Sequence, residues 1–318
     1  MQRCSIIIAA YNEGANLERC LSSLAKIDYP SDHFEVIVVD NNSTDDTKDI
    51  VAGYPGVRYL KEEKKGPSNA RNLGIQYAGY DIVVFLDADT TVAPDWLKVL
   101  IRDLSDTSIG AVGGEIRPIK PGNIISNYLS ISLFMRYHRY GGKRDLRGYP
   151  SCNLAVRKSL IHDTAFDPAL LRGQDKDLCY TILKQGYRIV FQPGAVIYHD
   201  HPDSLQALAP YFAKGALARV LLHEKHGSSP DILFFRTHIP LIFIALLAVL
   251  AITGKDIAAA LLVLAASLFL VANSVAAFAL SGRFALSFFV KPVLDIYSIM
   301  VTYFYFHLIQ IKNNLQKR

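Results

Sequence analysis

The sequence predicts an α/β domain with an open sheet, followed by an all-α region that spans a membrane. Through the first two hundred of its 318 residues, short apolar runs rich in β-branched residues alternate with stretches of helical spacing. From Ile232 onward, long apolar runs replace this alternation, and charged residues lie almost wholly outside them. We therefore expect two parts, a globular domain in residues 1–225 and a membrane domain of two or three helices in residues 226–318.

The globular part begins with a strand, a helix and a second strand. The runs CSIIIAA (residues 4–10) and FEVIVVD (residues 34–40) are of the kind that is buried on both faces of a parallel sheet. Between them, Leu17, Leu21 and Leu24 recur at helical spacing. The next expected elements are a helix over 43–54 capped by Ser43 or Thr44, a strand over 57–61, a helix over 68–77 and a strand over 81–89.

Polar side chains follow three of these strands at the point where each strand ends. Ligands of open α/β sheets bind beyond the carboxyl ends of the strands. The sequence therefore predicts a binding edge there. The clusters are Tyr11, Asn12 and Glu13; Asp40, Asn41 and Asn42; and Asp87 with Asp89.

The acids Asp87 and Asp89 indicate a metal site. Two neighbouring carboxylates repel one another unless a cation lies beside them, and Mg²⁺ or Mn²⁺ takes oxygen ligands while keeping positions open for phosphate. A diphosphate is the usual anionic substrate of such a metal. The alternative is that both acids cap the turn before a helix expected at Pro94.

Composition narrows the class of protein further. The net charge of +5 is modest and the basic residues are scattered, which gives no electrostatic case for nucleic acid. Four cysteines, Cys4, Cys20, Cys152 and Cys179, show neither the close pairing of a zinc site nor the density of a disulfide scaffold. Met1 leads directly into a strand pattern rather than a signal peptide, so we expect the first domain in the cytoplasm.

The apolar runs of the second part are long enough for membrane helices. At about 1.5 Å per residue, about Leu233–Thr253 and about Ile257–Leu280 would each cross a hydrocarbon layer of roughly 30 Å. A third stretch is interrupted by Lys291, Asp295 and His307, so two or three spans remain open. An amphipathic helix followed by a basic cluster, near residues 125–144, is expected either on the membrane surface or in the core.

Five segments, in this order, resemble those of glycosyltransferase family 2, the inverting nucleotide-sugar glycosyltransferases. They are AAYNE, VVDNNSTDDT, KGPSNARNLGI, FLDAD and LRGQDKDLCYTILKQGYRI. The resemblance covers roughly residues 3–225. It implies a Rossmann-like nucleotide-sugar transferase fold of GT-A type.

The resemblance also implies roles for residues of the donor site. Asp40 is expected to accept the base N–H, and the alternative is that it caps the following helix. Arg71 is expected beside the diphosphate, unless it pairs with Glu62 or Glu63 on the surface. The remaining donor residues implied are Ala10, Tyr11 and Glu13 for the nucleoside, Asn72 for the diphosphate, and Asp87 and Asp89 for the metal and ribose.

Inverting transfer to a hydroxyl needs a base that removes the acceptor proton. The family carries an acidic pair here whose second member resembles the general base, and Asp175 aligns with it. The first member is Gln174 in this chain, and losing that neighbouring charge makes Asp175 easier to ionise. The alternative role of Asp175 and Asp177 is to cap the helix that follows.

Three more residues are implied around the donor and acceptor. His199, or less favourably His201, is expected to close over the donor and ligate the metal, with a satisfied loop histidine as the alternative. Asn153, together with Cys152, is expected to line the acceptor side, with no catalytic role for the thiol. Arg219 is expected near the diphosphate on a basic helix.

Together these expectations describe a metal-dependent inverting glycosyltransferase of the cell envelope, with Mn²⁺ or Mg²⁺ as cofactor. The donor is a nucleotide sugar, with UDP-sugars favoured, and the acceptor is a hydroxyl of a membrane- or lipid-linked glycan in polysaccharide biosynthesis. We expect an integral protein of a prokaryotic inner membrane. The alternatives are a polyprenyl-phosphate glycosyltransferase and a membrane transport component with a degenerate sugar-binding domain.

Overall fold

The computed structural model describes residues 1–123, 126, 144–170, 172–204, 218, 221–222 and 225–226. The chain divides into two compact units, one of residues 1–120 with 136–201 and the other of residues 121–135 with 202–318. Almost all described residues belong to the first unit. The expected boundary between residues 225 and 226 stays a prediction.

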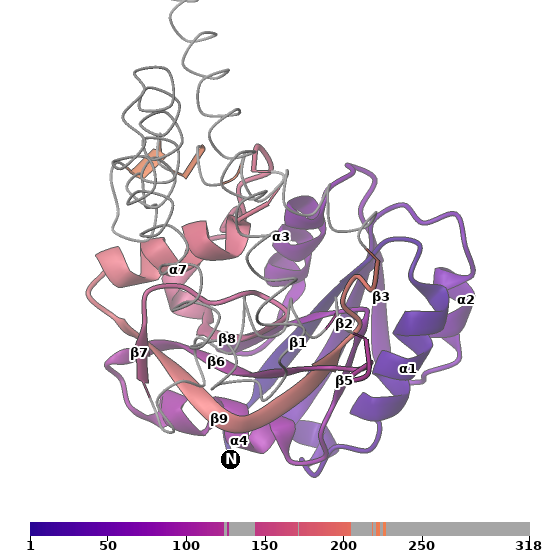
Figure 1. Ribbon diagram of the computed structural model, residues 1–318, viewed down its shortest axis with the longest axis horizontal. Coiled ribbons are helices and arrows are strands. Elements are labelled where there is room, and N and C mark those ends of the chain that lie inside the picture. The colour runs from indigo at the N-terminus through magenta and orange to yellow at the C-terminus, as the bar shows by residue number, and fades with distance from the viewer. Residues whose placement is uncertain are drawn as a thin grey trace, which may run out of the picture. The chain divides into compact units, whose positions relative to one another are not determined.

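The described strands form one curled, mixed sheet (Figure 1). Its order is β3-β2-β1-β4-β8-β6-β9-β5, with β7 also paired to β9. The strands are β1 (Cys4–Ala10), β2 (Phe34–Asp40), β3 (Val57–Lys61), β4 (Ile82–Asp87), β5 (Thr90–Val92), β6 (Ile109–Pro118), β7 (Arg144–Leu146), β8 (Asn153–Arg157) and β9 (Arg188–His199).

Four parallel strands, β3, β2, β1 and β4, make one half of the sheet. The interior positions of β1, β2 and β4 are almost completely buried, as the uninterrupted apolar runs predict, whereas the edge strand β3 is partly exposed. Ala10 pairs with Asp40 of β2, and Ala9 pairs with Asp87 of β4. The carboxyl ends that carry the acids therefore lie on either side of the end of β1.

The other half of the sheet brings later segments to the same edge. β8 is antiparallel to β4, with Asn153 opposite Leu86. β5 is antiparallel to β9, with Thr90 opposite His199. These pairings join residues 60 to 110 positions apart in the sequence, so no local pattern indicates them.

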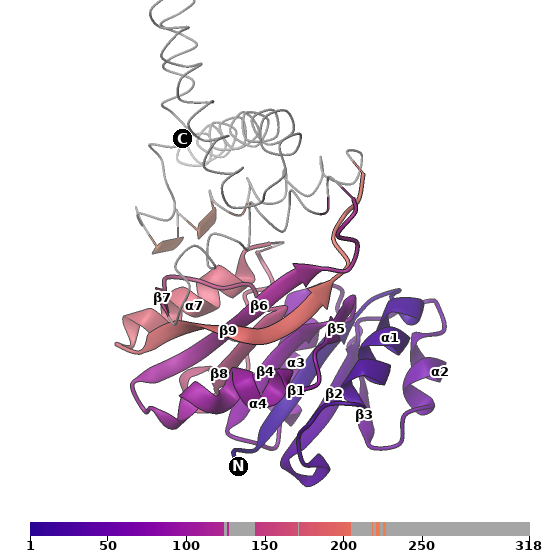
Figure 2. The ribbon, with the colours of Figure 1, turned by 60° about the horizontal axis from the view of Figure 1, so that its bottom comes forward.

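Helices cover both faces of the sheet. Helix α3 (Pro67–Tyr77) packs on β1 and β2, and α7 (Gln174–Lys184) packs on β6 and β9. Figures 1 and 2 show α3 and α7 on one face and α4 on the other. The remaining helices are α1 (Gly14–Leu24), α2 (Thr47–Ala52), α4 (Trp96–Ile101) and the 3₁₀ turns η1 (Ser31–His33), η2 (Arg102–Ser105) and η4 (Lys158–Leu160).

Two expected helix starts are corrected by the structure. Helix α2 begins at Thr47, and Ser43 caps nothing: its hydroxyl accepts the backbone N–H of Asn12 and so joins the loops after β1 and β2. Helix α7 begins at Gln174 after Gly173, whose φ of 81° is readily adopted by glycine. Asp175 and Asp177 therefore lie in the first turn of α7, where acids suit the helix dipole.

Within the described residues, no helix is long and apolar enough to cross a membrane. The spans expected near 233–253 and 257–280, and the amphipathic helix expected near 125–144, lie outside the described residues.

Candidate functional site

The acidic pair lies in a tight turn between β4 and β5. Asp87 is the last residue of β4, and the Thr90 hydroxyl donates to the Asp87 carbonyl at 2.7 Å, which closes the turn. Helix α4 begins only at Trp96, with Asp95 at its N-terminal boundary. The acids are thus separated from the start of this helix, and the alternative that they cap the turn before it stays a prediction.

His199 lies between the two acids. Its Nε2 is 3.8 Å from Asp87 Oδ2 and 3.7 Å from Asp89 Oδ1. The β5–β9 pairing makes this contact possible, since Thr90 lies opposite His199. Its Nδ1 is buried and has no hydrogen-bond partner among the described residues. His201 stacks on the other side of the ring, with centroids 4.5 Å apart.

Arg71 of helix α3 binds the other oxygen of Asp87. Its Nη2 lies 2.8 Å from Asp87 Oδ1, and its guanidinium lies over the Phe166 ring at 5.5 Å from the centroid. The alternative of a surface pair with Glu62 or Glu63 is therefore wrong. The pair places a fixed positive charge, 11% exposed, at the edge of the acidic cluster.

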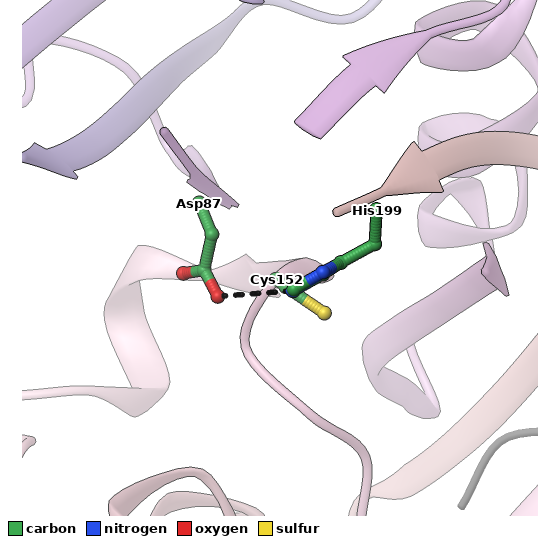
Figure 3. Close-up of side chains that lie close together, drawn as sticks. All are labelled: Asp87, Cys152 and His199. Atoms are coloured by element: carbon green, nitrogen blue, oxygen red, sulfur yellow. Dashed lines mark ion pairs between the residues drawn. The ribbon is translucent and has the colours of Figure 1, made fainter. Parts of the chain in front are cut away.

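A further member of this cluster, Cys152, was not expected from the sequence as a metal ligand. It precedes β8, and because Asn153 pairs with Leu86, Cys152 lies next to Asp87 across the sheet. One ligand atom from each of Asp87, Cys152 and His199 lies within 4.8 Å of the other two. Figure 3 shows Asp87 and His199 pointing toward one another from separate strands, with Cys152 beside them.

The ionisation of these groups is coupled. Burial opposes the charge on Asp87, but Arg71 and then His199 outweigh it and hold the pKa of Asp87 well below its usual range. Burial raises the pKa of Asp89 to about 6, with Asp87 and Glu13 adding to the rise against the opposing effect of His199. Burial opposes protonation of His199, yet Asp89 and Asp87 raise its pKa well above the usual value. His199 Nε2 thus lies between the two acids, in the place that suits a divalent cation.

The residues present fit a divalent metal. Two carboxylates, each about one quarter exposed, and the imidazole Nε2 of His199 converge on one point. Asp87, Asp89 and His199 would hold the ion, and Arg71 would remain on the far oxygen of Asp87.

Asp40 lies on the adjacent strand and is almost completely buried, at 4% exposure. Its Oδ1 accepts the N–H of Ser43 at 2.8 Å, and its Oδ2 accepts the hydroxyl of Tyr59 at 2.7 Å. Tyr59, on the edge strand β3, was not singled out from the sequence, because nothing local links it to a residue 19 positions earlier.

The three residues expected around the nucleoside differ in exposure. Ala10 is buried, and its carbonyl accepts the N–H of Asn41. Tyr11 is 47% exposed, with Lys65 Nζ 5.6 Å from the ring centroid. Glu13 precedes α1, accepts a hydrogen bond from Asn16 and contributes negative potential at Asp89. Their contact with a nucleoside stays a prediction.

Asn72 is buried and paired with the backbone of Phe166. Its amide nitrogen donates to the Phe166 carbonyl at 2.7 Å, and its amide oxygen accepts the Phe166 N–H at 2.9 Å. It therefore holds in place the loop on which Arg71 stacks. Direct contact of Asn72 with the diphosphate stays a prediction.

The expectation for Asn153 is corrected by the structure. Its side chain is fully buried, accepts the Trp96 indole N–H, and donates to the carbonyls of Glu115 and Ala195. The β6–β9 ladder shifts register between Gly114 and Glu115, and the amide satisfies carbonyls beside that irregularity. Asn153 is thus part of the core and lines no acceptor surface.

Asp175 is partly exposed in the first turn of α7, and its Oδ1 accepts the N–H of Lys176 at 2.8 Å. Among the described residues it makes no hydrogen bond or ion pair with Asp87, Asp89 or His199. Arg219 lies outside the described residues. The roles of Asp175 and Arg219 therefore remain predictions.

The curled mixed sheet is an α/β fold of GT-A-like glycosyltransferase type. The chain belongs to the family described as glycosyl transferase family 2, whose model matches residues 5–164.

Two curated relatives match about two thirds of the chain. Glycosyltransferase AglE of Haloferax volcanii is 31% identical over 219 residues, which cover 66% of this chain and 71% of the relative. The pre-mycofactocin glycosyltransferase of Mycobacterium tuberculosis is 29% identical over 211 residues, which cover 64% of this chain and 43% of the relative. The chain thus spans less than half of the second relative.

Solved structures share the fold. The mannosyltransferase PcManGT from Pyrobaculum calidifontis, in complex with GDP-Man and Mn²⁺, has a TM-score of 0.68 at 23% identity and is matched over 96% of this chain and 86% of that one. TarS 1–349 of S. aureus, in complex with UDP-GlcNAc, has a TM-score of 0.54 at 21% identity, over 70% of this chain and 67% of that one.

Proposed function

We propose that this glycosyltransferase is metal-dependent and inverting, and that it moves a sugar from a nucleotide-diphosphate donor to a hydroxyl of a membrane- or lipid-linked glycan. The observation that carries the proposal is the convergence of Asp87, Asp89 and His199 beside a fixed arginine, next to the strand that ends in Asp40. Family membership favours an enzyme over a transport component with a degenerate domain.

The spacing of the strand ends supports a nucleotide donor. Because β1 lies between β2 and β4, Asp40 and Asp87 are separated by one strand, roughly two spacings of about 4.8 Å. A nucleoside bound at Asp40 would therefore extend its diphosphate toward Asp87 and Arg71. Structural neighbours were solved with GDP-Man and with UDP-GlcNAc. We favour a UDP-sugar as donor.

The charges of the site suit a departing diphosphate. A bound Mn²⁺ or Mg²⁺ supplies electrostatic stabilisation of the negative charge that develops on the leaving group. Arg71 adds a positive charge on the side of Asp87 away from His199. Phe166 supports the guanidinium plane, and Asn72 fixes the Phe166 backbone, so this charge is held before the donor arrives.

Asp175 is our candidate for the base that removes the acceptor proton. Its hydrogen bond from the Lys176 N–H occupies one carboxylate oxygen and leaves the other available. An inverting transfer is a single displacement in which the acceptor oxygen attacks opposite the diphosphate. Asp175 takes the hydroxyl proton as the bond to the anomeric carbon forms.

We place the enzyme in a prokaryotic inner membrane, with the catalytic domain on the cytoplasmic side where sugar nucleotides are made. The apolar runs after Ile232 support this location. A polyprenyl-phosphate acceptor is the competing proposal within the same class. Such an acceptor is already ionised at neutral pH and has little need of Asp175.

The variant Asp175→Asn tests the role of the base. We expect kcat to fall about 10²- to 10⁴-fold, with donor affinity unchanged, because the amide cannot accept the proton. Turnover is measured with nucleotide sugars and a hydroxyl acceptor, and donor affinity by calorimetry. Asp163→Asn, an exposed acid elsewhere on the domain, is the control. Unchanged turnover would contradict the assignment of Asp175 as the base. Transfer to a polyprenyl phosphate at the same rate in the wild type and in Asp175→Asn would favour the competing acceptor.

A further inference from the structure

The acidic cluster contains a ligand type that Mg²⁺ and Mn²⁺ do not favour. Asp87 offers an oxygen, His199 a nitrogen and Cys152 a sulfur, and these three atoms lie within 4.8 Å of one another (Figure 3). Thiolate and imidazole favour softer ions such as Zn²⁺, whereas Mg²⁺ and Mn²⁺ favour carboxylate, carbonyl and water. The ligand chemistry of this chain therefore differs from that of an all-oxygen site.

The thiol is held in place by the sheet. Cys152 is 4% exposed and lies directly before β8, whose first residue, Asn153, is fixed by three hydrogen bonds. The neighbouring Asp87 is fixed at its other oxygen by Arg71. Both ligands are thus preorganised, which lowers the cost of ordering them around an ion.

The number of ligands also matches zinc. Catalytic zinc sites use three protein ligands and leave a fourth position open. Asp89, whose Oδ1 lies 3.7 Å from His199 Nε2, adds a further carboxylate beside these three ligands. With a thiolate, two carboxylates and Arg71, a divalent ion brings the formal charge of the cluster to zero.

We infer that Cys152 is a metal ligand, and that the site accordingly binds Zn²⁺ in preference to Mg²⁺. On binding, the S–H bond breaks, the sulfur coordinates the ion and the proton leaves to solvent. This inference rests on the proposed function, because it assumes that the site binds a divalent metal. It assigns a residue and an ion preference that transfer activity alone does not reveal.

The test is spectroscopic and uses the full chain without any donor. Co²⁺ bound through a thiolate gives a sulfur-to-metal charge-transfer band in the near ultraviolet, and Zn²⁺ abolishes the band by displacement. We expect the band in the wild type and its loss in Cys152→Ser, with Zn²⁺ affinity about 100-fold weaker by chelator competition. Excess Mg²⁺ should leave the wild-type band unchanged.

Cys20→Ser is the matched control, because the Cys20 thiol is also buried and its sulfur lies 3.9 Å from the Asp87 carbonyl oxygen. The band should survive in this variant. A band missing from the wild type, or surviving in Cys152→Ser, would overturn the inference.

Zinc X-ray absorption keeps the test decisive if Cys152→Ser does not fold. A sulfur neighbour at about 2.3 Å in both the wild type and Cys20→Ser supports the inference, and a shell of only oxygen and nitrogen overturns it. A chain that shows the thiolate band but transfers no sugar would contradict the proposed function and leave the metal assignment intact.

Discussion

Asp40 is a buried carboxylate with unused hydrogen-bond acceptor capacity. Ser43 N–H and the Tyr59 hydroxyl each occupy one of its two oxygens. A carboxylate has about four lone-pair positions, so each oxygen can still accept one more hydrogen bond. Burial, and then the hydrogen bond to Asp40, raise the pKa of Tyr59 to about 12, which keeps the phenol protonated as a donor. We interpret Tyr59 as the residue that positions Asp40.

Replacing Tyr59 by Phe removes this donor and little else. We expect the free energy of unfolding to fall by about 1–3 kcal/mol, because a hydrogen bond to a buried charge is lost. Nucleotide affinity should fall as well, because the orientation of Asp40 is no longer fixed. Denaturant unfolding and calorimetric titration with UDP and GDP measure the two effects.

Tyr54→Phe is the matched control for Tyr59→Phe. The Tyr54 hydroxyl donates at 3.2 Å to the exposed carbonyl of Glu18, where water can replace it. This variant should change neither quantity by more than about 0.5 kcal/mol. Equal effects in the two variants would contradict a special role for Tyr59.

At the scale of elements, a glycine sets how closely helix α3 approaches β1. A Cβ atom at Gly74 would lie 2.4 Å from Ile7 Cγ2, and Ile7 is 1% exposed in the centre of the sheet. Helix α3 also carries Arg71 and Asn72, so its distance from the sheet determines where Arg71 meets Asp87.

Gly74→Ala should therefore destabilise the fold although alanine favours helix. The gain in helix propensity is about 1 kcal/mol, and overpacking a well-filled core costs about 1–3 kcal/mol. We expect a net loss of up to about 2 kcal/mol in denaturant unfolding, together with weaker donor binding as Arg71 shifts.

The double variant Gly74→Ala with Ile7→Ala checks the cause. Ile7→Ala alone should cost about 2–5 kcal/mol through the cavity that it leaves. With the Ile7 methyl groups gone, Gly74→Ala should no longer destabilise. Purely additive losses would show that close packing on Ile7 is not the reason for the glycine.

At the scale of the whole molecule, the sequence predicts the parallel half of the sheet better than the antiparallel half. Residues 4–10, 34–40 and 57–61 are strands as expected, and the first two are runs buried on both faces, which are recognisable locally. The neighbours of Asp87 come from segments 65 and 112 positions later, so Cys152 was missed as a member of the cluster. Asn153 was misread for the same reason, since its partners belong to α4, β6 and β9.

Motif order identified the acidic pair and His199 because each has a local signal, either at a strand end or directly after a strand. The partner of Arg71 has no such signal. The sequence suggested Glu62 or Glu63 as an ion-pair partner of Arg71, because both lie near its helix in the chain. Only the packing of α3 on β1 brings Arg71 to Asp87 instead.

A metal at this cluster should stabilise the whole catalytic unit, because its ligands come from the ends of β4 and β9 and the segment before β8. An ion that binds the folded state alone adds about 2.7 kcal/mol at 100 times its Kd, which corresponds to a rise in Tm of about 5–10 °C for a domain of this size. Thermal unfolding of the full chain with Mn²⁺ or Zn²⁺, and again after EDTA, measures the shift. His199→Gln should reduce it sharply, because it removes the imidazole between the two acids. His33→Gln, on η1 and paired with Asp32, should keep it. A shift of equal size in both variants would show that the ion binds elsewhere.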